Sequence, residues 1–436
     1  MREIVNLIDI RCITPGVGAF MHRFYDTSPI SPSGKYIAVM HFPFEDRSPS
    51  PGDQATVIVM KLLDSSVVYE SKTAAWDTQV GAHLQWGAND SELFFNRMNP
   101  KTWVPYGVKV DLFSKNERSL SNTVYMVSPD GRLCLSPCLR RISLAQAGYG
   151  VCVPKDSIPK NDGASMSDGV YITDTETGSS QLLISIASIV EQLKEHFHDV
   201  DVSSGSFYGF HTKWSPDGQK IMFILRWLAE GERKTKNYLI TMNADASNVQ
   251  LALSAKRWVG GHHPNWCPDS TFIIMNLMYR NQNVSFYRFK NFMERVARKL
   301  KFRYFTNAEY LRLAKIKHDG SEIIMLSGTT FGSGHPTMHN SGEFIVTDAY
   351  PNERVSFSNG NTPLRMIQLN CDKEILLAKL DTTPAYNGVN SEWRIDPHPA
   401  WDNTGRYLTF NAAINGVRKV FVADFKKVFE SNELAL

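Results

Sequence analysis

Five histidines occupy the same position in a phrase that recurs along this chain. Each stands three residues before an apolar residue and just ahead of a turn and an apolar run. They are His83, His211, His263, His335 and His398. Composition alone would place about 0.2 histidines at seven chosen positions. Imidazoles transfer protons near neutral pH and bind metals, so this register predicts a catalytic or metal-binding site. The alternative is that histidine is a hydrogen-bonding spacer inherited with the repeat.

Three of these histidines precede a proline, which biases the residue before it towards an extended backbone. They are His263, His335 and His398. Asp396 lies two residues before His398, so on a strand the two side chains would face the same side. With His335 from the adjacent unit they would form the ligands of one divalent ion, either manganese, zinc or calcium. The alternative is that Asp396 only orients His398.

Arginine and tyrosine side chains near the repeated phrase complete a site for an acidic substrate. Arg226 and Arg97 each end an apolar run that follows a repeated histidine, and a guanidinium binds a carboxylate through two contacts. Tyr149 lies between two glycines, and Tyr208 lies in an aromatic segment of the fourth unit. We assign His83, His211, His263 and Tyr149 to proton transfer, and Arg226, Arg97 and Tyr208 to substrate binding. The alternatives are strand-end salt bridges for the arginines and core packing for the tyrosines.

The elements that must position these side chains are short β-type runs, joined by turns of the Pro-Asp-Gly type. Seven such units begin near Thr27, His83, Val124, His211, His263, His335 and His398. Their intervals of 41 to 87 residues suit four-stranded blades with insertions. We therefore predict an all-β fold, a seven-bladed β-propeller with short helical insertions, formed as a single domain by residues 1–436.

In a propeller, equivalent positions of different blades lie at one height around the axis, so the five histidines are expected to converge. The 26 residues before Thr27 are expected to pair with the last blade and close the ring. An eight-stranded barrel or a pair of β-sandwiches would not explain one turn phrase repeated seven times.

Two insertions have helical patterns. Residues 184–198 carry apolar side chains at helical spacing and are expected to cap a blade. Residues 289–317 are basic, with arginines and lysines among aromatic residues. We expect this segment to be either a solvated helix that covers the propeller edge or a lip that attracts an anionic ligand.

Composition limits the class of protein further. With 47 basic and 44 acidic residues, the net charge of +3 argues against nucleic-acid binding through bulk charge. The chain has no run of about eighteen apolar residues, so we expect no membrane-spanning segment and no membrane partner. The charged N-terminal segment does not resemble a signal peptide, and the six cysteines show no CxxC spacing. We therefore expect a cytoplasmic protein, or a periplasmic or secreted one if a leader was removed.

The blade-start phrases resemble those of the β-propeller polysaccharide lyases, namely oligogalacturonate lyases and propeller-type ulvan lyases. The resemblance covers most of residues 27–425. In oligogalacturonate lyases a His-x-x-aromatic phrase carries the catalytic histidine, and the run from His263 to Trp266 is similar to it. The family's metal-binding histidine on a following blade is matched by His335. Its Gln-x-x-His-x-His group corresponds to Trp393, Asp396 and His398, so two of those three ligands differ here.

In the propeller-type ulvan lyases an early histidine and a later tyrosine share the proton transfers, and His83 and Tyr149 match them in order and approximate spacing. Either resemblance implies β-elimination on an acidic, uronate-containing oligosaccharide or polysaccharide. Both His83 and His263 stay open as the proton acceptor. No paired carboxylates of the kind that glycoside hydrolysis needs stand at the blade starts. The second hypothesis is a non-catalytic propeller of the Tol-system type, which would bind a partner or ligand in its central funnel.

Overall fold

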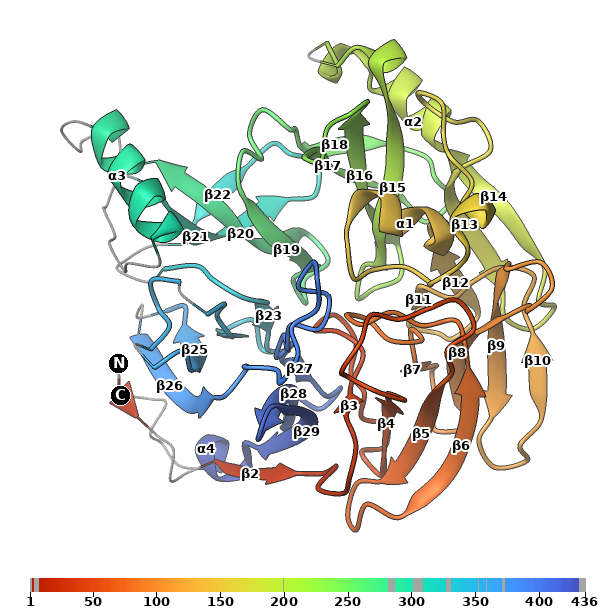
Figure 1. Ribbon diagram of the computed structural model, residues 1–436, viewed down its shortest axis with the longest axis vertical. Helices are drawn as coiled ribbons and strands as arrows, with labels where there is room; N and C mark the ends of the chain where they lie inside the picture. The colour runs from red at the N-terminus through yellow and green to blue at the C-terminus, as the bar shows by residue number, and fades with distance from the viewer. Residues whose placement is uncertain are drawn as a thin grey trace.

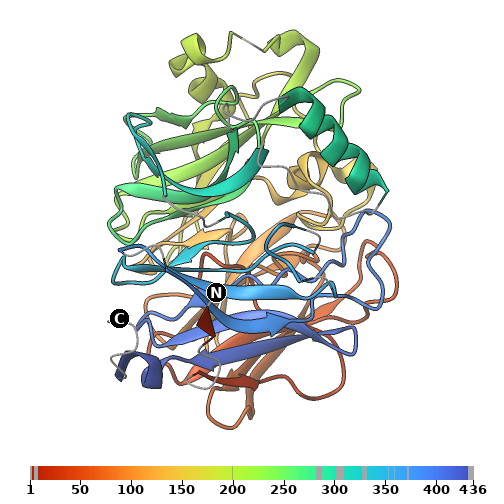
Figure 2. The ribbon, with the colours of Figure 1, turned by 90° about the vertical axis from the view of Figure 1, so that its left-hand side faces the viewer.

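The strands of this protein form seven sheets arranged around a central axis, a seven-bladed β-propeller (Figure 1). The computed structural model describes residues 2–3, 8–198, 200–280, 287–300, 309–326, 331–351, 353–357, 359–370 and 373–430. The predicted fold class is confirmed. Figure 2 shows the ring from the side, with the loops and helices that connect the strands extending from its faces.

The first five blades follow one another along the chain, each with four antiparallel strands. Blade 1 contains β3 (Phe20–Met21), β4 (Tyr36–His41), β5 (Ala55–Lys61) and β6 (Val67–Thr73), and blade 2 contains β7 (Gln85–Trp86), β8 (Glu92–Met98), β9 (Pro105–Asp111) and β10 (Glu117–Ser119). Blade 3 contains β11 (Met126–Val127), β12 (Leu133–Ser136), β13 (Gly169–Asp174) and β14 (Ser180–Ser185). Blade 4 contains β15 (Gly205–Trp214), β16 (Lys220–Ala229), β17 (Thr235–Asn243) and β18 (Gln250–Leu253). Blade 5 contains β19 (Gly261–Trp266), β20 (Phe272–Arg280), β21 (Glu309–Lys317) and β22 (Ile323–Met325).

The last two blades both recruit N-terminal strands. Blade 6 contains β23 (Thr337–Met338), β24 (Phe344–Thr347), β25 (Thr362–Gln368) and β26 (Lys373–Leu380), and β1 (Arg2–Glu3) pairs parallel with β26. Blade 7 contains β27 (Ala400–Trp401), β28 (Tyr407–Ile414) and β29 (Val417–Asp424), and β2 (Asp9–Cys12) pairs antiparallel with β29. The predicted closure of the ring by the N-terminal segment is therefore confirmed.

Four α-helices decorate the described part of the ring: α1 (Leu139–Ala145), α2 (Ile186–Gln192), α3 (Tyr287–Lys299) and α4 (Lys426–Glu430). The helix predicted over residues 184–198 is present only in part, because β14 ends at Ser185, α2 spans Ile186–Gln192 and a short 3₁₀ helix spans Lys194–His196. The prediction for residues 289–317 is wrong in its second half, because residues 309–317 form β21 in the middle of blade 5. Among the described residues, no helix is long and apolar enough to cross a membrane.

The inner strand of blade 1 is interrupted. Phe20 pairs with His41 at one end of β4, whereas Ile30 pairs with Ile37 at the other end. The residues between the end of β3 at Met21 and Ile30 leave the sheet and enter the axis, where the ring of Phe24 contacts histidines from other blades. The predicted unit start at Thr27 falls within this excursion.

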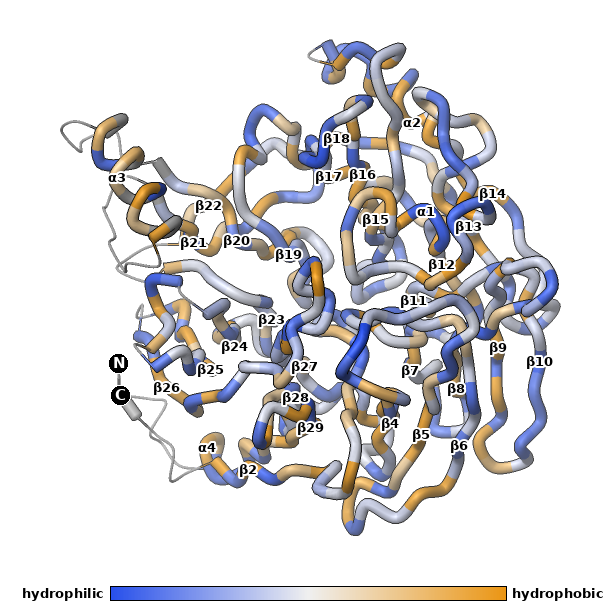
Figure 3. The backbone as a smooth tube through the Cα atoms, viewed as in Figure 1, coloured by the Kyte–Doolittle hydropathy of each residue, from blue (hydrophilic) through white to orange (hydrophobic). Residues whose placement is uncertain are grey.

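Tryptophans that stand three residues after the repeated histidine pack into the core. They are Trp86, Trp214, Trp266 and Trp401, and each is at most 8% exposed. Hydrophobic stretches also follow strands such as β5 and β20 (Figure 3). The apolar residue that the sequence repeats is thus a packing element, and burial of each indole contributes roughly 2–3 kcal/mol to stability. This packing does not require the histidines of the phrase, so they are available for another role.

Buried asparagines on the second strands bind each blade to the next. Asn96 exchanges two hydrogen bonds of 2.8 Å with the backbone of Val124, where the following blade begins. Asn411 accepts a 3.1 Å hydrogen bond from the backbone amide of His22 across the ring closure. Both asparagine side chains are essentially inaccessible to solvent. They satisfy backbone groups that would otherwise be buried without partners.

Replacement of Asn96 by alanine is expected to lower the free energy of unfolding by about 1–3 kcal/mol, because it leaves the Val124 backbone groups buried without partners. Urea denaturation followed by circular dichroism measures the change. Asn116→Ala is the control, since this asparagine lies in an exposed turn. Equal stability of the two variants would contradict the proposed role of Asn96 between the blades.

Candidate functional site on the propeller axis

Four of the five repeated histidines surround one phenylalanine on the axis. The ring centroid of Phe24 lies 4.5 Å from that of His398, 5.4 Å from His211, 6.0 Å from His335 and 6.5 Å from His263. These residues come from five different blades, so the shared height of equivalent positions brings them together. Phe24 itself is completely buried.

The fifth histidine, His83, joins this cluster through Tyr125. The centroid of the Tyr125 ring lies 5.0 Å from His83, and the Tyr125 hydroxyl is hydrogen-bonded to Nδ1 of His211. Nε2 of His83 lies 3.9 Å from Oδ2 of Asp77. The side chain of His83 is only 2% exposed. It lies below the surface of the site rather than at its opening.

The backbone at the histidines differs from the expectation. His83, His263 and His398 have positive φ angles of 56°, 62° and 50°. The predicted extended conformation is therefore wrong at the last two of these, although each precedes a proline. At His263 the cause is a break in strand register between His262 and Asn265, which turns the side chain towards the axis. Left-handed backbone at a non-glycine residue costs about 1 kcal/mol or more, and such residues concentrate at functional sites.

His263, His335 and Tyr350 form a contiguous group. The imidazole rings of the two histidines stack with centroids 3.9 Å apart. The Tyr350 hydroxyl lies 3.4 Å from Nε2 of each histidine. Nδ1 of His263 donates to the carbonyl of Gly334 at 2.8 Å, which places the free lone pair of this ring on Nε2.

His335, Asp396 and His398 present ligand atoms within 4.8 Å of one another, as the sequence analysis expected for a metal site. Asp396 and His398 do not lie on a strand, since β27 begins only at Ala400. Nδ1 of His335 donates to Oδ2 of Asp348 at 2.9 Å, so Nε2 is the ring nitrogen that is left to bind an ion.

This donor set fits a divalent metal ion on three observations. Both ring nitrogens of buried His398 lack hydrogen-bond partners among the described residues. The carboxylate of Asp348 orients His335 as outer carboxylates orient metal-ligating histidines. Two imidazoles and one carboxylate form a set that first-row transition metals prefer. Arg394 limits the negative charge available, because its Nε donates to Oδ2 of Asp396 at 2.9 Å.

Burial keeps four imidazoles of the cluster neutral. It lowers the pKa values of His263, His398, His211 and His83 well below 6.5, and neighbouring positive groups add to the effect. Neutral imidazoles at pH 7 are able to accept protons or bind a metal. Charged imidazoles would repel one another at these distances.

Tyr149 lies beside Arg394 at the edge of the cluster. Its ring centroid is 5.8 Å from that of His211, and its hydroxyl accepts a 3.4 Å hydrogen bond from Nη2 of Arg394. Gly148 and Gly150 flank it with φ angles of 83° and 81°, a backbone that favours glycine. Burial raises the pKa of Tyr149 to about 12, so the phenol stays protonated.

Arg226 approaches the cluster from blade 4. Its guanidinium carbon lies 3.6 Å from the centroid of the Phe210 ring, and its Nη1 donates to Oε1 of Gln146 at 2.9 Å. Burial lowers the pKa of Arg226 to about 10, which leaves it charged at neutral pH. Tyr208 is its direct cross-strand partner and is buried.

Arg97 is held away from the histidines. Its Nη1 and Nη2 donate to the carboxylate of Glu117 on the outer strand β10, at 2.6 and 2.8 Å. The strand-end salt bridge that the sequence left as an alternative is thus the observed arrangement. Arg97 is not available to the cluster in this geometry.

Buried charges hold the plug in place, where the plug is the segment between Met21 and Ile30 that leaves blade 1 and enters the axis. Nζ of Lys213 lies 3.0 Å from Oδ2 of Asp26, and Nη1 of Arg23 lies 3.3 Å from Oδ1 of the same carboxylate. Lys213 also donates to the carbonyl of Pro264 at 3.0 Å. These contacts tie the plug to blades 4 and 5 and hold Phe24 beneath the histidines.

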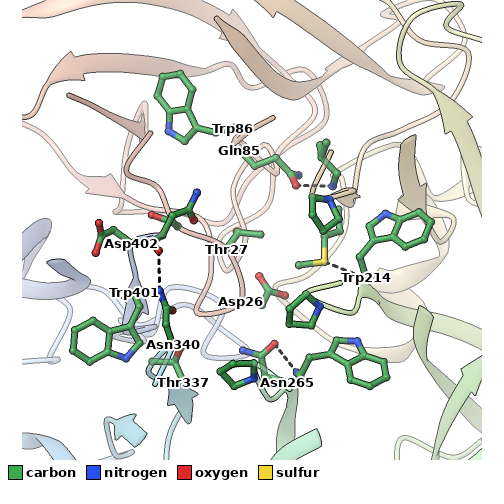
Figure 4. Close-up of a pocket in the computed structure, with 18 of the residues that line it drawn as sticks. Asp26, Thr27, Gln85, Trp86, Trp214, Asn265, Thr337, Asn340, Trp401 and Asp402 are labelled. Carbon is green, nitrogen blue, oxygen red and sulfur yellow. Dashed lines mark hydrogen bonds between the residues drawn. The ribbon is translucent and has the colours of Figure 1, made fainter. Parts of the chain in front are cut away.

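A pocket of about 540 Å³ is lined by residues of the plug and by none of the five repeated histidines. Figure 4 shows Asp26 in its centre, surrounded by Trp86, Trp214 and Trp401. Its described lining includes asparagine, glutamine and hydroxyl side chains but no lysine or arginine. The histidine side, where Arg394 and Arg226 lie, is therefore the better candidate for an acidic ligand.

Sequence reasoning missed Arg394, Tyr350, Phe24 and His22. His22 follows the inner strand of blade 1, next to His398, whose pKa it helps to lower. All four lie outside the repeated phrase. The only signal for Arg394 was its place two residues before Asp396, and nothing in the sequence distinguished Tyr350.

Fold and site together define a seven-bladed β-propeller with a histidine-lined site on its axis. No protein-family model and no curated protein sequence matches the chain. Solved structures do match. An oligogalacturonate lyase from Vibrio parahaemolyticus is 12% identical, with a TM-score of 0.59 over 98% of this chain and 96% of that one. An oligogalacturonate lyase in complex with manganese is 11% identical, with a TM-score of 0.60 over 97% of this chain and 94% of that one.

The TolB protein of Acinetobacter baumannii is 10% identical and has a TM-score of 0.39 over 90% of this chain and 80% of that one. That score is too low to support any argument. At their identities, the two lyases share the propeller fold with this chain.

Proposed function

We propose that this protein is a lyase that cleaves a uronate-containing oligosaccharide or polysaccharide by β-elimination. The supporting observation is the convergence of neutral imidazoles from several blades with two tyrosines and two arginines, on the side of the axis that carries positive charge. The similarity in fold to two solved oligogalacturonate lyases also supports this proposal. In this reaction the C5–H and C4–O bonds break, a C4–C5 double bond forms, and a proton reaches the leaving oxygen.

His263 is the proposed base. Its Nε2 bears the lone pair, and burial keeps the ring neutral at pH 7. The side chain is partly exposed, whereas His83 is almost completely covered. This difference in access favours His263 over His83 as the group that removes the C5 proton. His83 then has an orienting role behind Tyr125.

Tyr149 is the proposed proton donor to the leaving oxygen. Because its phenol stays protonated and accepts a hydrogen bond from Arg394, it is oriented and ready to donate. His211 lies beside the Tyr149 ring and is positioned to return a proton after each turnover. General acid and base groups of this kind each accelerate a reaction by about 10²–10⁴-fold.

Arg394 and Arg226 are proposed to bind the uronate carboxylate, and Tyr208 supports Arg226 from the adjacent strand. Charge on the carboxylate must be neutralised so that the C5 hydrogen becomes acidic enough to remove. A divalent ion held by His335, Asp396 and His398 would supply additional neutralisation when bound. Two nitrogen donors favour zinc or manganese over calcium.

A glycoside hydrolase mechanism has less support. Such enzymes need two carboxyl groups that face the scissile bond. Here Asp396 is bound to Arg394, and Asp348 is bound to His335. Among the described residues of the cluster, imidazoles rather than paired carboxylates offer the free proton-transfer atoms.

The decisive assay follows ultraviolet absorbance of the new C4–C5 double bond on polygalacturonate, oligogalacturonates and ulvan, with and without added manganese or zinc. We expect the absorbance to increase on at least one of these glycans. Absence of the unsaturated product on all of them, under every metal condition, would refute the lyase proposal. It would then favour the non-catalytic alternative, in which the pocket of Figure 4 receives a ligand.

The metal site carries its own prediction. His398→Ala is expected to lower the affinity for zinc or manganese by about 10–100-fold or more, because a ligand is lost. Isothermal titration with metal-free protein measures the affinity. His318→Ala is the control, since this histidine lies in a turn outside the cluster. Equal metal affinity in both variants would remove the metal site from the proposal.

A further inference from the structure

Helix α3 carries an apolar stripe that faces solvent. Phe289 is 62% exposed, Phe292 60%, Met293 39% and the following Leu300 69%. These positions recur at spacings of three, four and seven residues, so they lie on one face of the helix. Isolated apolar residues on a surface need no explanation, but a continuous stripe of four does.

The remaining residues of α3 are mostly basic in sequence. Tyr287–Lys299 contains Arg288, Lys290, Arg295, Arg298 and Lys299 against Glu294 alone, a net charge of +4. The whole chain has a net charge of only +3, so the residues outside the helix carry a net charge of −1. Figure 3 shows both strongly hydrophilic and strongly hydrophobic residues along this short segment.

The place of α3 in the fold leaves this face accessible. The helix follows β20, whose end lies beside His262 on the histidine side of the ring. Figures 1 and 2 place it at the outer edge of blade 5, away from the axis. Lys290 and Ala297 are partly buried, whereas Phe289, Phe292 and Arg295 are exposed.

We propose that α3 docks the protein onto an anionic lipid surface. A helix with an aromatic and aliphatic face flanked by lysine and arginine lies in the membrane interface, where acyl chains cover the apolar face and lipid phosphates pair with the basic residues. This mode needs no membrane-spanning segment, so it is consistent with the absence of one among the described helices.

Other occupants fit α3 less well. An acidic glycan requires hydrogen-bonding side chains on the contacted face, and the stripe of Phe289, Phe292, Met293 and Leu300 has none. A second copy of this chain would bring two helices of charge +4 together, which like-charge repulsion opposes. An anionic bilayer complements both the stripe and the charge.

The test uses the full-length protein and sedimentation with two kinds of vesicle, phosphatidylcholine alone and phosphatidylcholine mixed with phosphatidylglycerol. We expect binding to the anionic vesicles that weakens as salt rises, because ions screen the basic residues. The double variant Phe289→Ser, Phe292→Ser is expected to bind at least about tenfold more weakly, since it removes two inserted side chains. The variant Lys290→Gln, Arg295→Gln should lose the preference for anionic lipid.

Val17→Ser, Leu63→Ser is the matched control, because both side chains are more than four-fifths exposed but lie outside α3. It should bind vesicles like the unmodified protein. Equal binding of the phenylalanine variant and this control would overturn the proposal. An absence of vesicle binding would also overturn it. In that case light scattering tests for a dimer that depends on Phe289 and Phe292, and affinity electrophoresis tests whether polygalacturonate binds through them. Circular dichroism verifies that each variant is folded.

Discussion

Replacing His263 by alanine is expected to lower kcat/KM for β-elimination by about 10²–10⁴-fold while the protein stays folded. Nε2 of His263 carries the lone pair of the ring and, among the described residues, hydrogen-bonds only to the Tyr350 hydroxyl, at 3.4 Å, and the side chain is partly exposed, as a proton acceptor requires. The rate of absorbance increase on the active glycan measures the loss. The effect should fall on kcat rather than on KM, because the lost interaction belongs to the transition state.

His318→Ala serves as the matched control for this experiment, and it should retain the activity of the unmodified protein. Tyr350→Phe is a second informative variant, since it removes only the hydroxyl that lies between His263 and His335. A His263→Ala protein as active as the control would exclude His263 as the base. A similar measurement on His83→Ala would then become decisive.

Phe24→Ala is expected to destabilise the protein by about 3–5 kcal/mol, because it removes a completely buried ring from the centre of the cluster. It should also weaken metal binding, since His335 and His398 both pack against this ring. Chemical denaturation and metal titration measure the two effects. Phe24→Leu should restore much of the stability and less of the metal affinity, because leucine fills the volume without the flat ring.

Phe113→Ala is the control for Phe24, since its side chain is 61% exposed and its loss should change stability by less than about 1 kcal/mol. Comparable stability of the two variants would mean that Phe24 does not support the cluster. Unchanged metal affinity in a destabilised Phe24→Ala protein would limit its role to packing.

The fold was predictable because a propeller repeats the same four-stranded unit seven times. Each repeat keeps its turn and the apolar residue three places after its first position. The same logic predicts that His335 and His398 lie close together, and their ring centroids are 4.3 Å apart. The prediction holds for these residues because equivalent positions of different blades lie at the same height along the propeller axis. Asp396 does approach both histidines, but not for the predicted reason, because Asp396 and His398 precede β27 and do not lie on a strand.

Residues outside the repeat were not predictable in this way. Phe24 reaches the axis only because the inner strand of blade 1 is interrupted, which no local propensity indicates. Tyr350 and Arg394 come from connecting segments whose paths depend on tertiary packing. The backbone of His263 shows the same limit, since a register break overrides the preference that proline imposes on its neighbour.

The ring closure has a consequence for the order in which the site is built. Strand β2 pairs with Asp424 and its neighbours, and the backbone of His22 bonds to Asn411. Phe24 follows directly, so its final position depends on strands that leave the ribosome about 400 residues later. During synthesis the early blades are able to fold one by one, but the plug waits for the last of them. The histidine cluster is therefore completed in a single late step, when the two ends of the chain meet.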